Sequence, residues 1–349
     1  MDAILTHFRE QAAFCDLFGS PFTARLLEAM ARDYEAQGPV YALVGGWPSP
    51  PRADALSLRL TGALHFAALS GKDEPLAAQY PAAEPNWRME TVWPIACDFL
   101  ARENAWVAQF IQSPPQTNET RRSIGLFVGF AELAQRFGLP LDTYEIGASA
   151  GLNLNWDSFA FRTDSWAWGA GDVVIDTAFS GAAPPMDAPI RVARRAACDI
   201  HPLDIRDPLK RLQLRSYIWP DQADRLARFD GAVALALAHD VRVDAASADV
   251  WLAEKLNARE ASACAVIYHS VFYQYPPPAV REAIKDAIYA AGARATPNTP
   301  LAWLRFEPEA LWQSTDIPTR FVIDMITWPG ETREILAAAD PHGRMVERL

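Results

Sequence analysis

Apolar residues recur at helical spacing through the first third of the chain. Leu26, Leu27, Met30 and Tyr34 follow Ser20, a capping residue that is succeeded by a proline at the first helical position. The same spacing predicts further helices over residues 56–69, 91–111 and 122–138. We therefore expect a helical region over residues 1–120.

After residue 140 the pattern becomes extended. Short apolar runs bounded by turn residues predict strands over residues 141–146, 190–198, 241–245, 263–268 and 301–306, a helix over 278–291, and a closing hairpin from 321–327 and 333–338. Strands that alternate with helices predict an α/β fold with a mostly parallel sheet of about seven strands and an antiparallel end. We place this domain at residues 121–349, with a hairpin inserted near residues 157–189.

Composition narrows the class of protein. Half of the 349 residues are hydrophobic, and the net charge is -11, which argues against a nucleic-acid partner because such proteins need a basic face. No apolar run approaches the roughly 20 residues that cross a bilayer. The N-terminus lacks a signal-peptide pattern, and the four cysteines form no CxxC pair. We expect a cytoplasmic protein with neither a membrane partner nor a structural zinc.

The segment from Glu145 to Gly151 covers the end of the strand predicted over residues 141–146 and the glycine-rich turn after it, and an apolar helix is expected to start beyond the turn. This segment is open to two interpretations. As a nucleotide turn, its small residues let the backbone approach a cofactor. An acidic residue two positions before the first glycine is typical of S-adenosylmethionine-dependent methyltransferases, in which Glu145, Gly147, Ser149 and Gly151 would hold the methionine end. Later strand ends would supply Asp199 for the ribose, and Ser247 with Asp249 for the adenine.

The second interpretation of the same residues is the Gly-x-Ser-x-Gly elbow of a serine hydrolase. A triad in the chain order serine, aspartate, histidine would be Ser149, Asp324 and His342. Helices rather than several strands precede the turn, no His-Gly-Gly segment lies upstream, and Glu145 would place a carboxylate in a normally apolar strand. We therefore favour the cofactor turn.

Other polar residues are candidates for the chemistry. Gln116, Asn118, Glu119 and Arg122 form a dense cluster before a helix, where Asn118 and Glu119 also suit helix capping. His269 ends a buried strand and is the candidate base, although a histidine bonded to a backbone carbonyl is the structural alternative.

The predicted sets follow from these positions. The catalytic set is His269, Glu119 and Tyr275, and the substrate-binding set is Gln116, Asn118, Arg122 and Gln274. Asp199, His201 and Asp204 on one short loop are a weak metal set, so no metal is predicted.

Three segments carry a resemblance to a known family. They are Pro115 to Glu119 with Arg122, Glu145 to Asp157, and His269-Ser270 with Gln274-Tyr275. Together they resemble an uncharacterised prokaryotic family, domain of unknown function 2332, over nearly the whole chain. The resemblance implies a Rossmann-like fold similar to methyltransferases and brings no established reaction. Ser149 stands where typical methyltransferases have a glycine.

From the sequence we expect a methyltransferase that uses S-adenosylmethionine and acts on a small molecule. The alternatives are a serine hydrolase acting through Ser149 and a non-catalytic nucleotide-binding protein with a methyltransferase-like fold.

Overall fold

The computed structural model describes residues 2–259, 262–312 and 320–349. The chain divides into two compact units, the first of Met1–Thr117 with Ile205–Phe229 and the second of Asn118–Asp204 with Asp230–Leu349. Helix α10 (Ala223–Ala238) begins in the first unit and ends in the second. Within the described part of the chain, none of the helices combines the length and apolar character that a bilayer crossing requires.

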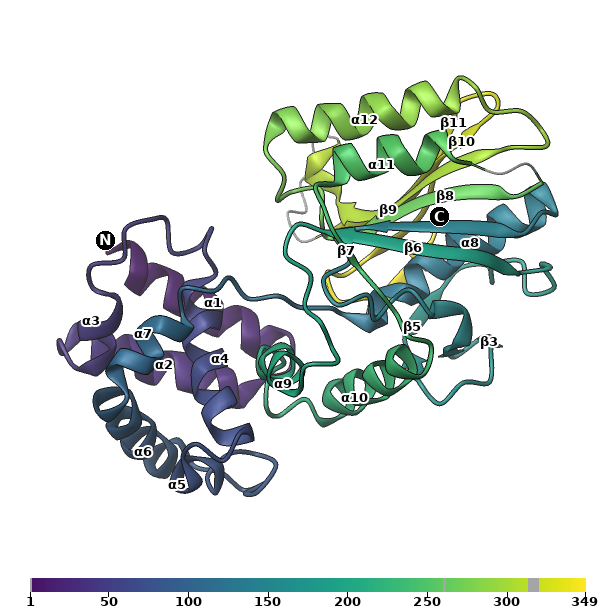
Figure 1. The fold of residues 1–349 in the computed structure, drawn as a ribbon. Coiled ribbons are helices and arrows are strands. Elements are labelled where there is room, and N and C mark those ends of the chain that lie inside the picture. Colours follow the sequence, from purple (N-terminus) through teal and green to yellow (C-terminus); the bar gives the residue numbers. More distant parts are fainter. Residues whose placement is uncertain (1, 260–261, 313–319) are drawn as a thin grey trace. The chain divides into compact units, whose positions relative to one another are not determined.

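The first unit is helical. Its other elements are α1 (Ala3–Leu17), α2 (Pro21–Glu35), α3 (Pro39–Val44), α4 (Leu56–Leu69), α5 (Glu74–Ala77), α6 (Met89–Arg102), α7 (Asn104–Phe110) and α9 (Pro208–Ser216) (Figure 1). Leu26, Leu27, Met30 and Tyr34 of α2 are buried in its core, as their spacing predicts.

One predicted helix of this unit is in fact two. The helix expected over residues 91–111 breaks at Glu103, between α6 and α7. The break lets Trp106 pack its ring against Phe99 on α6 and Phe66 on α4, at centroid distances of 6.0 and 5.9 Å. Tertiary packing thus overrides a helical spacing that runs through the break.

The second unit contains all the strands of the described residues. Its strands are β1 (Leu141–Ile146), β2 (Ala160–Arg162), β3 (Ala167–Trp168), β4 (Val174–Asp176), β5 (Ala178–Ser180), β6 (Val192–Asp199), β7 (Asp244–Ala245), β8 (Cys264–Ser270), β9 (Leu301–Pro308), β10 (Phe321–Trp328), β11 (Thr332–Ala339) and β12 (Met345–Arg348). Its helices are α8 (Ser123–Phe137), α11 (Ala248–Asn257), α12 (Pro278–Gly292) and the short 3₁₀ helices η1 (Thr120–Arg122), η2 (Trp156–Ser158) and η3 (Glu309–Leu311).

Nine of these strands form one sheet in the described residues, in the order β5-β12-β11-β10-β9-β8-β1-β6-β7. The strands from β9 to β7 are parallel, whereas β9, β10, β11 and β12 pair antiparallel. The α/β prediction with an antiparallel end is therefore confirmed, but the sheet is wider than expected. The predicted closing hairpin of β10 and β11 is extended by β12, and β5 then pairs parallel to β12.

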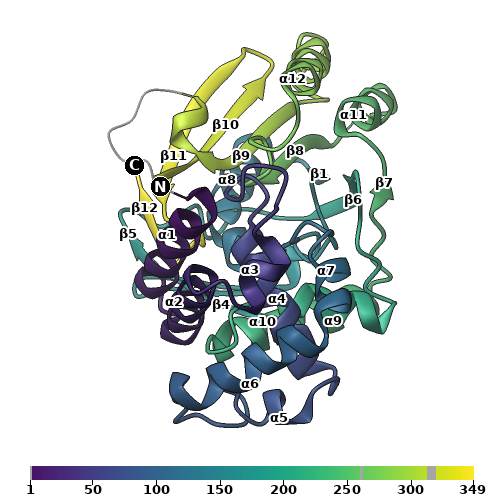
Figure 2. The ribbon, with the colours of Figure 1, turned by 90° about the vertical axis from the view of Figure 1, so that its left-hand side faces the viewer.

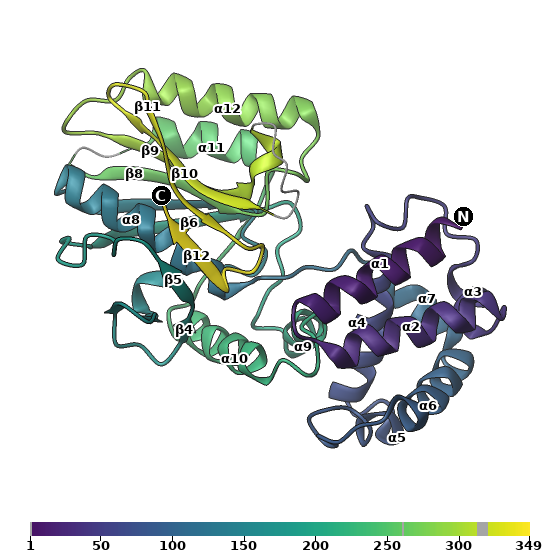
Figure 3. The same cartoon turned by 180° about the vertical axis from the view of Figure 1, so that it is seen from behind.

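Helices cover both faces of the sheet centre. Figure 2 shows α11 and α12 together on one face, where Ile284 and Ile288 of α12 and Leu252 of α11 join the same core as Ile267 and Trp303 of the sheet. Seen from behind in Figure 3, α8 lies along the opposite face, which is also reached by Tyr268, whose ring meets that of Phe130 on α8. Because both faces of the sheet centre are covered, every residue of β1 is buried, including the polar residues Asp142, Thr143 and Glu145.

The segment between β1 and β6 forms a second, three-stranded sheet in the order β3-β2-β4. The predicted hairpin is present as the antiparallel pair β2 and β3, and β4 adds parallel to β2. Its aromatic residues pack onto α8, where Phe127 contacts the rings of Phe161, Trp166 and Trp168. This packing explains the alternating aromatic residues without a ligand.

Gly129 lets α8 lie close to the sheet. A Cβ atom at this position would come within 2.3 Å of the Leu304 Cδ1 atom on β9, and Leu304 is fully buried. We expect Gly129→Val to lower the free energy of unfolding by about 1–3 kcal/mol through overpacking. Denaturant unfolding measures this change. Gly46→Ala is the control, since a Cβ there meets no atom within 4 Å. An equal effect of the two substitutions would contradict the packing argument.

Candidate functional site

The candidate site lies at the carboxyl edge of the parallel strands. The chain runs from β1 outward to β6 and β7, then returns to the other side of β1 to form β8 and β9. Open α/β sheets place their ligands outside the carboxyl ends of strands where the strand order reverses in this way. The segment from Gly147 to Gly151, here called the glycine turn, follows β1 at that point.

The glycine turn has an unusual backbone. Gly147, Ser149 and Gly151 all have positive φ, at 68°, 55° and 73°. The helix predicted to start after the turn is wrong, because turns and then η2 follow. Side chains hold this backbone in place, since Asn118 Oδ1 accepts from Leu152 N at 2.9 Å and Asn153 Nδ2 donates to the Glu119 carbonyl at 3.4 Å.

Asp199 fastens the glycine turn to the end of β6. Its Oδ2 accepts from Ser149 N at 2.8 Å, and its Oδ1 accepts from His201 N at 2.9 Å. The turn is also tied to β6 by Ala148 N, which donates to the Cys198 carbonyl at 3.1 Å. The carboxylate predicted to hold a ribose is therefore also a structural element of the turn.

Side chains of the protein fill the space beside both glycines. A Cβ on Gly147 would lie 2.1 Å from the Phe272 ring, and one on Gly151 would lie 2.8 Å from Val241 and 2.9 Å from Val243. With the positive φ values, this packing requires glycine at both positions. Their presence is explained by the fold without a ligand.

Glu145 is the most perturbed carboxyl of the site. It is 3% exposed, and Tyr268 on the neighbouring strand donates its hydroxyl to Glu145 Oε2 at 3.2 Å. Burial raises the pKa of Glu145 to about 8; the hydrogen bond from Tyr268 opposes this rise, and the charge of Asp199 adds to it. Glu145 therefore keeps its proton at neutral pH, and carboxyls with a pKa shifted in this way are common in functional sites.

The structure brings part of the polar cluster before α8 to the glycine turn. Asn118 contacts Leu152, and Glu119 contacts Asn153 as above, while the Glu119 side chain accepts from Arg121 N at 3.1 Å. Arg122 is 8% exposed and donates from Nε to the Pro341 carbonyl at 2.8 Å. Gln116 belongs to the first unit, so it is not among these contacts within the second unit.

His269 is enclosed in the core beside β9. Its ring is fully buried, Nδ1 lies 2.6 Å from Glu307 Oε1, and Nε2 accepts from Trp303 Nε1 at 3.0 Å. Because Nε2 already accepts a hydrogen bond from Trp303, the ring hydrogen lies on Nδ1, which donates a hydrogen bond to Glu307 Oε1. In this arrangement neither nitrogen is open to a substrate. Gln274 and Tyr275 follow on the loop after β8 and are exposed.

Ser247 and Asp249 form the start of α11. Ser247 is the N-cap residue, its hydroxyl donates to Asp249 Oδ1, and Asp249 lies in the first turn of the helix. Both therefore lie at the carboxyl end of β7, as predicted, in positions that also favour the helix itself.

The aspartate predicted for a serine triad is engaged elsewhere. Asp324 is fully buried and paired with Arg305 and with Arg333, while the backbone N of His342 donates to Asp340 Oδ1. Among the described residues, no three His, Cys, Asp or Glu side chains are grouped as metal ligands.

Three residues that the sequence did not single out belong to the site. Tyr268 contacts Glu145, Phe272 packs on Gly147, and Glu307 accepts from Phe272 N at 2.8 Å and from Tyr273 N at 3.1 Å. Glu307 carries a signal in the sequence, since it and Arg305 are charged residues in the mostly apolar run of β9. A charge in a buried strand implies a specific partner.

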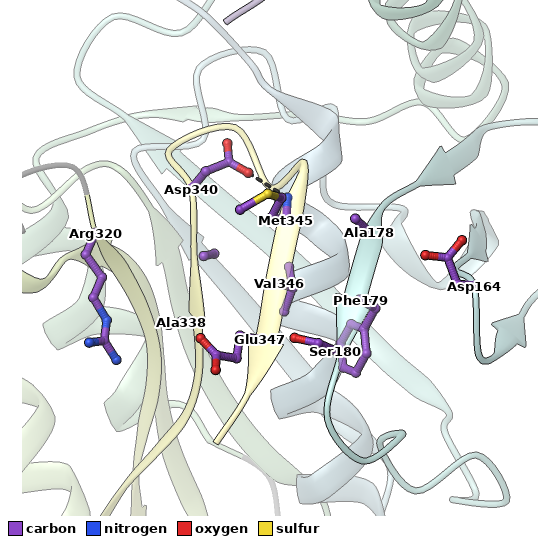
Figure 4. Close-up of a pocket in the computed structure, with 11 residues that line it drawn as sticks. Asp164, Ala178, Phe179, Ser180, Arg320, Ala338, Asp340, Met345, Val346 and Glu347 are labelled. Atoms are coloured by element: carbon purple, nitrogen blue, oxygen red, sulfur yellow. Dashed lines mark hydrogen bonds between the residues drawn. The ribbon is translucent and has the colours of Figure 1, made fainter. Parts of the chain in front are cut away.

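A hollow of about 470 Å³ lies at a different place, beside β5, β11 and β12. Figure 4 shows Arg320, Asp340 and Glu347 around it, with Ala338, Phe179 and Val346 supplying apolar surface. Asp340 is engaged in the loop before β12, where it accepts from Met345 N at 2.6 Å. The lining contains none of the predicted site residues.

A family model matches nearly the whole chain. The family model described as "Uncharacterized protein conserved in bacteria (DUF2332)" matches residues 6–348. No curated protein and no solved structure matches the chain.

The raised pKa of Glu145 predicts a pH-dependent effect of its removal. In the unfolded chain this carboxyl ionises near 4.5, whereas the folded protein keeps the proton up to about 8. Stability from the protonated form is thus complete below pH 4.5 and lost as pH rises through 8. Relative to wild type, Glu145→Gln should gain stability progressively over this range, by on the order of 4 kcal/mol.

Thermal unfolding from pH 4.5 to 9 measures this gain. Glu254→Gln, which replaces an exposed carboxylate on α11, serves as the matched control and should track wild type. A difference between Glu145→Gln and wild type that does not change with pH would contradict the assignment.

Proposed function

We propose a function for this chain, which belongs to the uncharacterised bacterial family DUF2332. In this proposal, the protein transfers the methyl group of S-adenosylmethionine to a small molecule. The observation that carries the proposal is the placement of two acidic side chains. Glu145 is the penultimate residue of β1, and Asp199 is the last residue of the neighbouring strand β6 and binds the glycine turn, at the reversal of strand order. The order β7-β6-β1-β8-β9 of parallel strands is also that of a Rossmann-type sheet.

Asp199 retains the capacity to bind a ribose. Each of its oxygens accepts one backbone N–H, and each carboxylate oxygen has two acceptor positions. The next residue, Ile200, is 66% exposed and offers an apolar contact for the adenine ring. Ser247 and Asp249, at the end of β7 next to β6, would face the polar edge of the base.

In this proposal, side chains rather than a helix N-terminus hold the methionine end of the cofactor. Turns follow the glycine turn, so no helix dipole is directed at the ligand there. Glu145, protonated below its pKa of about 8, can donate to the ligand carboxylate, and in its ionised form it can pair with the ammonium group. Side chains thus replace the helix dipole in the proposal.

The reaction mainly requires that the acceptor atom and the methyl group be aligned. The acceptor atom attacks the methyl carbon as the bond from that carbon to sulfur breaks, and placing the two in line accounts for most of the acceleration. The enclosed ring of His269 is not used in this step. Tyr275, which is 71% exposed on the loop after β8, is the accessible member of the predicted catalytic set.

A second candidate function rests on Ser149. Its φ of 55° between two glycines at a strand end is the kind of strained position in which hydrolases hold their nucleophile. Asp324, the aspartate predicted for its triad, is fully buried and paired with Arg305 and Arg333. This reading therefore ranks below methyl transfer. A non-catalytic adenosyl-binding protein would share the cofactor site without turnover.

Ligand binding can be tested by thermal unfolding with S-adenosylmethionine and S-adenosylhomocysteine. A ligand that binds the folded state raises the melting temperature, and we expect a rise of several degrees in wild type. The rise should disappear in Asp249→Ala and persist in Glu254→Ala, a matched change on the same helix. Asp199→Ala should also lose the rise, with lower stability because Ser149 N loses its acceptor. No rise in wild type would refute the proposal.

Labelling with a fluorophosphonate probe tests the hydrolase reading. Under the methyltransferase proposal, wild type and Ser149→Ala should be labelled equally weakly, because a serine without a base is a poor nucleophile. Stoichiometric labelling of wild type that Ser149→Ala abolishes would favour the hydrolase.

A further inference from the structure

The loop after β8 begins with a strained residue. Val271 has a φ of 55°, and a β-branched residue in the left-handed region is rare and strained. Such a conformation persists only where the surroundings fix it. Val271 N donates to the Phe306 carbonyl at 2.9 Å, which ties the strained residue to β9.

Glu307 supplies the rest of the fixation. Its Oε1 accepts from Phe272 N, Tyr273 N and His269 Nδ1, at 2.8, 3.1 and 2.6 Å. Both Glu307 and His269 are fully buried. The Tyr273 ring stacks on His269 at 5.5 Å, and its hydroxyl donates to the Arg281 carbonyl at 2.8 Å. One carboxylate oxygen therefore holds the backbone of the loop at Phe272 and Tyr273.

The residue that this carboxylate places is Phe272. Its ring occupies the space beside Gly147, on the glycine turn that follows β1. The next part of the loop, through Gln274 and Tyr275, is exposed. The loop thus turns one aromatic ring onto the candidate site and leaves the following side chains accessible.

We propose that Glu307 is a positioning residue that fixes Phe272 as the wall of the candidate site at Gly147. This inference rests on the proposed function in one respect: the wall determines how much space the amino-acid end of an adenosyl ligand has. Burying a carboxylate is costly unless it is hydrogen-bonded. Glu307 accepts hydrogen bonds from two amides of one loop and from a histidine, and it therefore holds that loop.

Amide hydrogen exchange tests the positioning without any ligand. Glu307→Met removes the acceptor, and the amides of Phe272 and Tyr273 should lose protection about tenfold or more relative to the amides of β9. Glu307→Gln keeps an oxygen acceptor and should preserve the ratio. Normalising to β9 separates a local effect from a general loss of stability, and Glu307→Gln remains informative should Glu307→Met fail to fold. An unchanged ratio in Glu307→Met, or a ratio lost equally in Glu307→Gln, overturns the positioning role.

Ligand binding tests the wall. Phe272→Ala should change the affinity for S-adenosylhomocysteine about tenfold and leave that for adenosine, which lacks the amino-acid end, unchanged. Equal changes for the two ligands, or none, overturn the wall. If wild type binds neither, the proposed function fails and with it the role of Phe272 toward this ligand, while hydrogen exchange still decides whether Glu307 positions the loop.

Discussion

The bond between the Asp199 carboxylate and the glycine turn is the constraint on which the candidate site depends. Ser149 has a positive φ, and its N–H points to Asp199 Oδ2 at 2.8 Å. Without this acceptor the turn would have a buried donor with no partner, which costs about 1–3 kcal/mol. The same carboxylate accepts from His201 N, so it joins the turn after β1 to the loop after β6.

The other side of the turn depends on a similar device. Glu307 on β9 holds the loop after β8, and that loop packs Phe272 against Gly147. Two buried or half-buried carboxylates on strands flanking β1 and β8 thus shape one edge of the sheet. Ser149 and Val271, two of the seven non-glycine residues with positive φ among the described residues, lie at this edge, and strained backbone of this kind motivates a functional hypothesis.

The prediction of the fold succeeded where the signals are local. The strands of the sheet centre and α8 with its glycine stop come from side-chain spacing and from Gly138 at a φ of 63°. The break at Glu103, the turns after Gly151 and the pairing of β5 with β12 were missed. Each of these is decided by distant partners, such as Asn118 for Leu152 or Phe66 for Trp106.

By itself, the sequence determined that Glu145, Asp199, Ser247 and His269 lie at or close to the carboxyl ends of strands, because the hydrophobic run and the polar residues near its end are adjacent in the chain. The tertiary structure alone decided what these groups do with their hydrogen-bonding capacity. His269 lies between Glu307 and Trp303, 38 and 34 residues away, and Asp199 serves a turn 50 residues before it. Hydrogen bonds over such separations depend on strand order, which spacing along the chain does not encode.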